Sequence, residues 1–320
     1  MQAVQIGRGR GHHLVVGQYL LLDRLGSGGM GRVFLARHRT LGRLAAIKLV
    51  RLDRRHCTIT RARFLREVRL VGRLNHENVV HAHDAGIAHN SLYLAMEYVP
   101  GSDLGREIVA NGALDVGRAC EYARQAALGL QHIHDRGLIH RDLKPANLGL
   151  ASAGRTVKVL DVGLARSNRS GKRDSGLTHA RKLMGSPDYA APEQILDARK
   201  VDTRADLYSL GCSLYHMLAG RVPFPAGTAV AKALRHLSES PRPIDEVRAD
   251  LPAGLGDLVR KLMARRREDR YGTAREVAAA LASFAIPIPI AIASSTCPTV
   301  ADLALGLLTN DECVTLSSSS

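Results

Sequence analysis

The first hundred residues carry apolar runs of the length and alternation typical of β-strands. A run from Tyr19 to Leu25 ends in a cluster of glycines and resumes from Val33 to Ala36, which predicts a β-hairpin. Further along, apolar spacing predicts three strands and one helix: strands at Arg43–Val50, Val79–Ala85 and Leu92–Tyr98, and a helix at Thr60–Leu74.

From Leu114 onward the pattern changes, and apolar residues recur at spacings of three and four, as on one face of a helix. The predicted helices are Val116–Arg136, Arg204–Ala219, Ala229–Leu237, Leu255–Ala264 and Ala274–Phe284. A strand-rich part followed by a helix-rich part predicts an α+β fold with a small β-rich lobe, a larger helical lobe and a cleft between them.

The boundary between the lobes falls near Pro100-Gly101, so we expect one lobe at residues 16–99 and the other at 100–284. The opening, residues 1–15, is rich in glycine and arginine, and we expect a flexible extension there. Residues 285–320 consist of short apolar pieces and Ser/Thr runs, which favours a poorly ordered tail, although Thr299–Leu308 could form a short helix.

Composition narrows the class of protein. The chain has a net charge of +15, but its basic residues are scattered and only 4% of residues are aromatic, so we expect no specific nucleic-acid binding. The five cysteines include no Cys-x-x-Cys pair, which argues against a zinc site or disulfide framework and fits a reducing cytoplasm. We find no secretion signal and no run of about 20 apolar residues for a membrane segment, so we expect a cytoplasmic protein.

Residues 140–147 read His-Arg-Asp-Leu-Lys-Pro-Ala-Asn and carry candidate chemistry for phosphoryl transfer. Asp142 offers a carboxylate for a hydroxyl proton, Asn147 an amide oxygen for a metal, and Lys144 a cation. Taken alone, the string could be a chance surface loop after a helix.

A glycine segment, Leu25-Gly-Ser-Gly-Gly-Met-Gly-Arg-Val33, lies between the two strands of the predicted hairpin. This setting excludes the dinucleotide fingerprint, which needs a strand leading into a helix. A tight hairpin also favours glycine, so the pattern alone is weak. Amides without side chains can instead close over nucleotide phosphates.

Taken in order, these segments resemble the protein kinase family. The glycine segment is followed by Ala45-Ala-Ile-Lys48, the string at 140–147, Asp161-Val-Gly163 and Ala191-Pro-Glu193. Each short string is common by chance, but all of them in this order are not. The resemblance covers about Val16 to Phe284, and the glycine segment looks like that of the bacterial eukaryotic-like serine/threonine kinases.

The resemblance implies a serine/threonine protein kinase that transfers the γ-phosphoryl group of Mg-ATP to Ser/Thr hydroxyls of protein substrates. It also implies autophosphorylation. It assigns Asp142 as the proton acceptor, Lys144 as the cation on the transferring phosphoryl, and Lys48, held by Glu67, as the phosphate-positioning cation. Asn147 and Asp161 would bind Mg²⁺, with Mn²⁺ as an alternative. The implied nucleotide contacts are Leu25, Gly26, Gly28, Gly31, Val33, Ala46, Lys48, Met96, Glu97 and Val99.

Four structural and regulatory roles follow from the same resemblance. Asp206 would support the catalytic loop, and Arg270 would form a buried ion pair with Glu193. Ser186 would assist substrate positioning, and autophosphorylation would fall at Thr178, or less favourably Ser175, where Arg141 could bind the phosphate.

Two residues depart from the family pattern. Val162 replaces a phenylalanine, and Gly149 stands where a leucine-like residue usually lies beneath the adenine, a loss worth about 1–2 kcal/mol of nucleotide binding. These departures keep open a pseudokinase scaffold that signals by binding. A small-molecule phosphotransferase of the same fold is disfavoured by Ala191-Pro-Glu193, and the oligomeric state is open.

Overall fold

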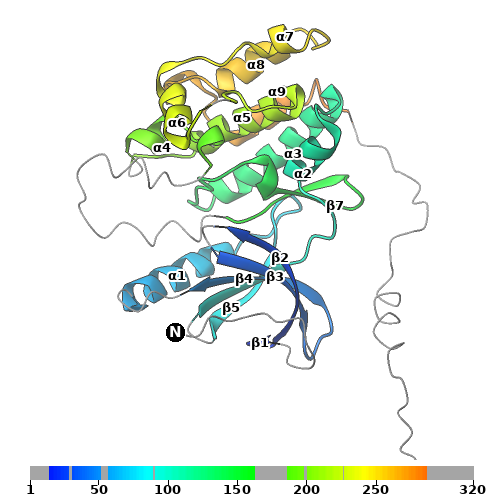
Figure 1. The fold of residues 1–320 in the computed structure, drawn as a ribbon, viewed down its shortest axis with the longest axis vertical. Helices are drawn as coiled ribbons and strands as arrows, with labels where there is room; N and C mark the ends of the chain where they lie inside the picture. Colours follow the sequence, from blue (N-terminus) through cyan, green and yellow to red (C-terminus); the bar gives the residue numbers. More distant parts are fainter. Residues whose placement is uncertain are drawn as a thin grey trace, which may run out of the picture. The chain divides into compact units, whose positions relative to one another are not determined.

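The structure, a computed structural model, describes residues 14–28, 31–51, 57–88, 91–162, 186–197, 200–225 and 227–286. These residues form a lobe built on a β-sheet and a lobe built mainly of helices (Figure 1). The predicted α+β architecture with a small β-rich lobe and a larger helical lobe is therefore confirmed.

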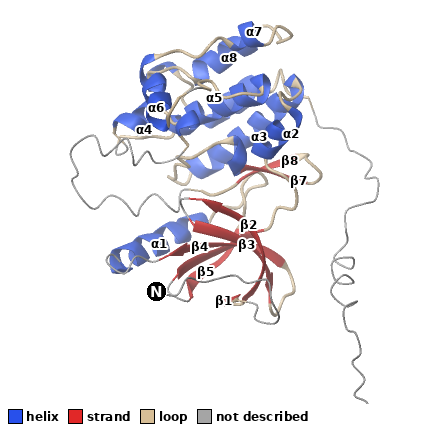
Figure 2. Ribbon diagram, in the orientation of Figure 1, coloured by secondary structure: helices blue, strands red, loops and turns tan. Residues whose placement is uncertain are grey.

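The first lobe is built on a six-stranded antiparallel sheet in the order β1-β2-β3-β4-β6-β5. Its strands are β1 (Val15–Val16), β2 (Tyr19–Gly28), β3 (Gly31–His38), β4 (Leu44–Arg51), β5 (Ala82–Ala88) and β6 (Ser91–Glu97). One helix, α1 (Cys57–Val71), lies beside the sheet (Figure 2). The helix and β6 share buried residues of the main core, because Phe64 and Leu94 both belong to it.

The second lobe holds the remaining helices of the described chain. They are α2 (Leu104–Asn111), α3 (Val116–His134), α4 (Pro192–Leu196), α5 (Arg204–Ala219), α6 (Ala229–Ser238), α7 (Ile244–Val247), α8 (Leu255–Leu262) and α9 (Ala274–Leu281). Helix α5 is buried along most of its length and packs against α3 and α8. Because α5 is buried on nearly all sides, it forms the centre of this lobe.

A short hairpin, β7 (Leu148–Ala151) and β8 (Thr156–Val159), belongs to the helical lobe but touches the segments that lead to and from the sheet. Isolated bridges join Val79 to Val159 and Asp103 to Gly149. The hairpin therefore holds the end of the 140–147 segment next to the residues that follow β6.

Most predicted elements exist, with shifted ends. The strand expected at Val79–Ala85 runs instead over Ala82–Ala88, because Val79 and Val80 pair with the β7–β8 hairpin. Helix α2 and the hairpin itself were missed. The helix expected at Thr299–Leu308 lies outside the described residues, as do residues 1–13 of the N-terminal extension and 287–320 of the tail. The predicted lobe boundaries stay predictions.

Candidate active site

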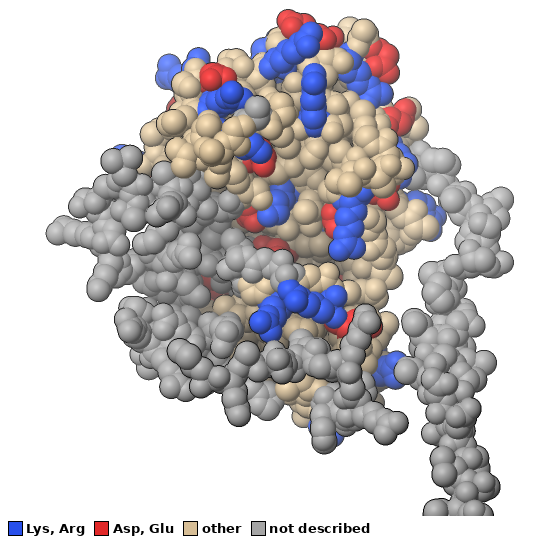
Figure 3. Space-filling model, in the orientation of Figure 1, with Lys and Arg blue, Asp and Glu red and all other residues tan. Residues whose placement is uncertain are grey.

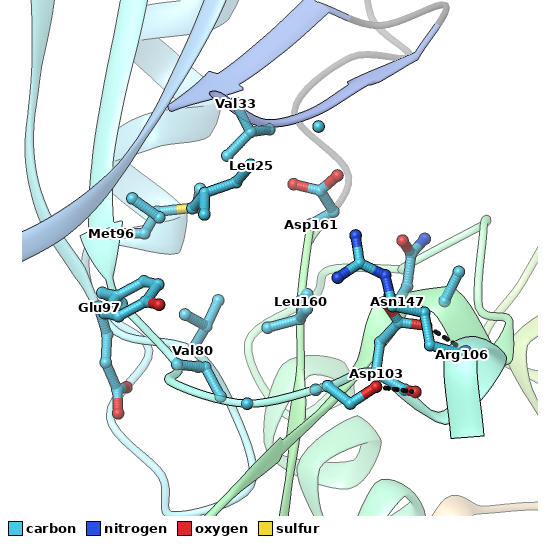
Figure 4. Close-up of a pocket in the computed structure, with 18 residues that line it drawn as sticks. Leu25, Val33, Val80, Met96, Glu97, Asp103, Arg106, Asn147, Leu160 and Asp161 are labelled. Carbon is cyan, nitrogen blue, oxygen red and sulfur yellow. Dashed lines mark hydrogen bonds and ion pairs between the residues drawn. The ribbon is translucent and has the colours of Figure 1, made fainter. Parts of the chain in front are cut away.

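A pocket of about 270 Å³ lies between the sheet and the helical lobe (Figure 4). Figure 4 shows Leu25, Val33 and Met96 on the sheet side and Asp103 and Asn147 on the helical side. The lining residues are Leu25, Gly26, Val33, Ala46, Val80, Met96, Glu97, Tyr98, Val99, Gly101, Ser102, Asp103, Arg106, Ala146, Asn147, Gly149, Leu160 and Asp161.

The pocket has an apolar part and a polar part. Apolar side chains come from β2, β3, β4 and β6, whereas carboxylate, amide and guanidinium groups come from Asp161, Asn147 and Arg106. An apolar slot beside convergent polar groups suits a ligand with a flat base at one end and anionic groups at the other. Nine of the predicted nucleotide and metal positions line it: Leu25, Gly26, Val33, Ala46, Met96, Glu97, Val99, Asn147 and Asp161.

The glycine segment forms the sheet-side rim. Gly31 has φ of +137°, and a Cβ there would collide with the carbonyl oxygen of Leu49, so only glycine fits this position without strain. At Gly26, in contrast, a Cβ would meet no atom within 4 Å. Gly28 pairs with Gly31 at the hairpin end. Of the three predicted glycines only Gly26 lines the pocket; there the rim presents backbone without a side chain, as a phosphate-binding loop requires.

Lys48 on β4 does not line the pocket itself, but it contacts Asp161 of the polar part. Its Nζ lies 3.0 Å from Oδ1 of Asp161, and the lysine is buried. Asp161 has φ of +59°, an uncommon conformation for a residue with a side chain. The ion pair of Lys48 is thus with Asp161, and the predicted pairing of Lys48 with Glu67, which lies on α1, stays a prediction.

The string at 140–147 brings Asp142, Lys144 and Ser186 into one polar cluster. Lys144 Nζ lies 3.3 Å from Asp142 Oδ2 and donates to Ser186 Oγ at 2.9 Å. The Ser186 amide donates to Asp142 Oδ1 at 3.2 Å. The predicted proton acceptor and cation are therefore adjacent, and Ser186 lies beside both of them.

Asn147 is oriented by its own loop. Its side-chain Nδ2 donates to the backbone carbonyl of Asp142 at 2.7 Å, within the tight turn at Pro145–Asn147. Because the amide nitrogen is engaged there, the amide oxygen is the group left to act as a ligand. With Asp161 lining the same pocket, the two residues offer the hard oxygen donors that Mg²⁺ prefers.

Asp206 on the buried helix α5 binds the backbone at the start of the 140–147 segment. Its carboxylate accepts from the amides of His140 at 2.8 Å and Arg141 at 2.7 Å, and lies 2.8 Å from His134 Nε2. Burial alone would raise the pKa of this carboxyl, but the hydrogen bond and charge of His134 hold the pKa below its usual value. These bonds keep Arg141 at φ of +64°, and the predicted supporting role of Asp206 is confirmed.

The ion pair predicted between Glu193 and Arg270 is present. Two guanidinium nitrogens of Arg270 contact the two carboxylate oxygens of Glu193 at 2.7 and 3.0 Å, and the Arg270 side chain is fully buried. Arg270 also donates to three backbone carbonyls, those of Ala264, Arg204 and Arg265. This network fixes α4, and with it the C-terminal end of the segment that carries Ser186.

Several lining residues were not identified from the sequence: Val80, Ser102, Asp103, Arg106 and Leu160. Of these, only Asp103 could have been found from the sequence. It stands just before Leu104 and Ile108, whose spacing is helical, and its side chain caps α2 by accepting a hydrogen bond from the Arg106 amide. Arg106 is held by Asp103 Oδ2 at 3.3 Å. A Cβ at Gly105 would lie 3.2 Å from the amide nitrogen of Ala146, so this glycine lets α2 approach the turn before Asn147 closely.

The two departures from the kinase pattern have different surroundings. Val162 is buried and belongs to the main core, so the smaller side chain is packed. Gly149 faces Leu160, whose side chain would contact a Cβ at that position. Gly163, Ser175 and Thr178 lie outside the described residues.

The charged side chains of the visible described surface are interspersed. Figure 3 shows Lys and Arg near Asp and Glu over several parts of this face. No helix within the described residues is long and apolar enough to cross a membrane.

Comparison with known proteins agrees with this geometry. Residues 19–281 match the family described as protein kinase domain. The chain is 39% identical to a probable serine/threonine-protein kinase PknB of Bifidobacterium longum, over 82% of this chain and 39% of that protein. It is 38% identical to serine/threonine-protein kinase pkn2 of Myxococcus xanthus, over 83% and 32% of the respective lengths.

The solved kinase domain of PknI from Mycobacterium tuberculosis is also similar. It shares 29% identity with a TM-score of 0.67, covering 85% of this chain and 98% of that domain. The chain thus spans about two fifths or less of these two curated relatives, but nearly all of the solved domain.

Proposed function

The chain belongs to the protein kinase family, and we propose that it transfers the γ-phosphoryl group of ATP to serine or threonine hydroxyls of proteins. The observation that carries this proposal is the cluster of Asp142, Lys144 and Ser186 next to a two-part pocket. A protein kinase acts with ATP and a divalent metal, and Mg²⁺ is the metal that the oxygen donors here fit, with Mn²⁺ as an alternative.

ATP fits the described pocket in outline. The apolar slot can hold the adenine beside residues 96–99, whose backbone offers hydrogen-bonding groups, and the glycine rim leaves room for phosphates. Lys48 supplies a buried cation at the polar end. Asn147 and Asp161 would hold the metal, which neutralises charge on the phosphates when bound.

The residues of the chain then divide the work of transfer. Asp142 accepts the proton of the attacking hydroxyl and orients it, while Lys144, 3.3 Å away, stabilises negative charge on the moving phosphoryl group. Because Asp206 holds the backbone amides of His140 and Arg141, directly before Asp142, the start of the loop keeps its position without help from the substrate.

A scaffold that binds nucleotide without efficient transfer is the alternative. The contacts around Asp142 favour the enzyme, because every polar group that the resemblance assigns to transfer is present in the chain. Purified protein with Mg²⁺ and γ-labelled ATP should incorporate label into itself and into an acceptor protein, at serine and threonine by mass spectrometry. Asp142→Asn is the control, and equal incorporation by both proteins would contradict the proposal. Nucleotide binding without incorporation would support the scaffold.

A further inference from the structure

Gly149 leaves a space in the wall of the pocket that another side chain occupies. The residue lies on β7 with an ordinary backbone conformation, because its φ is not among the positive values of the chain. A Cβ built on it would lie 3.2 and 3.3 Å from the two terminal methyl carbons of Leu160. These distances are tighter than normal contacts, so Leu160 already covers the face of Gly149.

The backbone of Leu160 is fixed from two sides. Its amide donates to the Asn147 carbonyl at 2.9 Å, and its carbonyl lies 2.7 Å from His140 Nε2. Leu160 also lines the pocket, and Figure 4 shows its side chain between Val80 and Asp161. With both backbone groups held, the side chain has a defined direction, across the glycine and into the apolar part.

We infer that Leu160 is the apolar floor on which the base of the nucleotide rests, and that Gly149 is small because Leu160 occupies its place. This inference rests on the proposed function, since it assigns a residue to the base-binding part of the same pocket. The two positions form an exchangeable pair: one large side chain is needed, and either position can carry it. The weaker nucleotide binding expected from the small residue at Gly149 is then offset by the side chain of Leu160.

The consequence is a reciprocal effect of substitution on ADP affinity. Leu160→Ala removes the floor and should weaken ADP binding about tenfold, the cost of one lost leucine contact surface. Gly149→Leu adds a second large side chain where Leu160 already lies, and should weaken binding as well. In the double variant Gly149→Leu/Leu160→Ala, the new leucine should replace the lost one and restore affinity to within about threefold of wild type.

The experiment is isothermal titration of ADP with Mg²⁺ into wild type, both single variants and the double variant. Leu128→Ala on α3, a half-buried leucine outside the pocket lining, is the matched control and should bind ADP as wild type does. Thermal unfolding followed by circular dichroism checks that each variant folds. If Gly149→Leu does not fold, Gly149→Val completes the same cycle.

The outcome is read from the coupling between the two sites. The loss in each variant is the factor by which its ADP affinity falls below that of wild type. The product of the two single-variant losses, divided by the loss in the double variant, should exceed about three. A smaller factor, or unchanged affinity in Leu160→Ala, overturns the inference. Wild type that binds no ADP overturns the proposed function instead, so the two failures are distinguishable.

Discussion

Acid should destabilise the fold through one buried histidine, His236 on α6. The ring is fully buried, contacts Phe224 edge-on at 4.8 Å, and places Nδ1 2.7 Å from the Tyr208 hydroxyl. Burial lowers the pKa of His236 from 6.5 to about 4, and the nearby Asp188 carboxylate only partly opposes this. The neutral ring is therefore the form that the folded state accepts.

The sign of the pH effect follows from this lowered pKa. Between pH 6.5 and about 4 the unfolded chain binds a proton at His236 that the folded chain does not, so the free energy of unfolding falls as pH falls. Proton linkage gives a cost of about 0.2 kcal/mol at pH 7 and about 2 kcal/mol at pH 5. The loss from this single group between the two pH values is therefore about 2 kcal/mol.

The assay compares wild type with His236→Gln, which cannot titrate. The chain contains no tryptophan, so urea unfolding is followed by circular dichroism at several pH values. His236→Gln should be less stable at pH 7, because it loses ring packing, but the gap to wild type should narrow by about 2 kcal/mol at pH 5. All other titrating groups are shared and cancel in the difference. A gap that stays constant from pH 7 to 5 would refute the reasoning.

Four further substitutions test the site and its support. Asp142→Asn should abolish phosphoryl transfer in the labelled-ATP assay while the melting temperature stays near wild type, since this carboxylate is partly exposed and lies outside the hydrophobic core. Lys48→Met should abolish transfer in the same assay and keep the fold, because the carboxylate it leaves behind can be solvated. Arg270→Met should cost about 3–5 kcal/mol of unfolding free energy in urea titrations, whereas the exposed Arg275→Met should cost at most about 0.5 kcal/mol. Arg106→Ala should weaken ADP binding about two- to fivefold and leave adenosine binding unchanged, both measured by calorimetry, if its guanidinium contacts phosphate.

The parts of the site that could be predicted are those whose chemistry requires a particular residue type. Asp142, Lys144 and Asn147 are close in sequence, so their proximity follows from one tight turn. Lys48 and Asp161 are far apart in sequence, and their order along the chain was the only signal that they share a site. Their direct ion pair was not foreseen, because the resemblance assigned Lys48 to Glu67.

The missed residues share a physical reason. Val80, Leu160 and Arg106 line the pocket because of tertiary contacts that leave no pattern in the sequence. Val80 donates its amide to Val159, which turns the chain away from the strand that its apolar run predicts. Leu160 belongs to an ordinary apolar run before Asp161, and nothing in that run distinguishes a residue that faces the pocket from one that faces the core.

Helix α5 explains why distant segments keep one geometry. Asp206 on this helix holds the catalytic-loop amides, and Ser209, one turn later, donates its hydroxyl to the Tyr189 carbonyl of the segment after Ser186. Tyr208 on the opposite side binds His236 and so fixes α6.

Each of these bonds starts from a helix that is buried nearly throughout, where side chains have few alternative rotamers. The catalytic loop, the segment that carries Ser186 and helix α6 are therefore positioned against one common reference rather than against one another. A change that loosens one of them, such as protonation of His236, need not displace Asp142, because the bonds of Asp206 remain intact. Acid should accordingly lower stability before it lowers the activity of the molecules that stay folded.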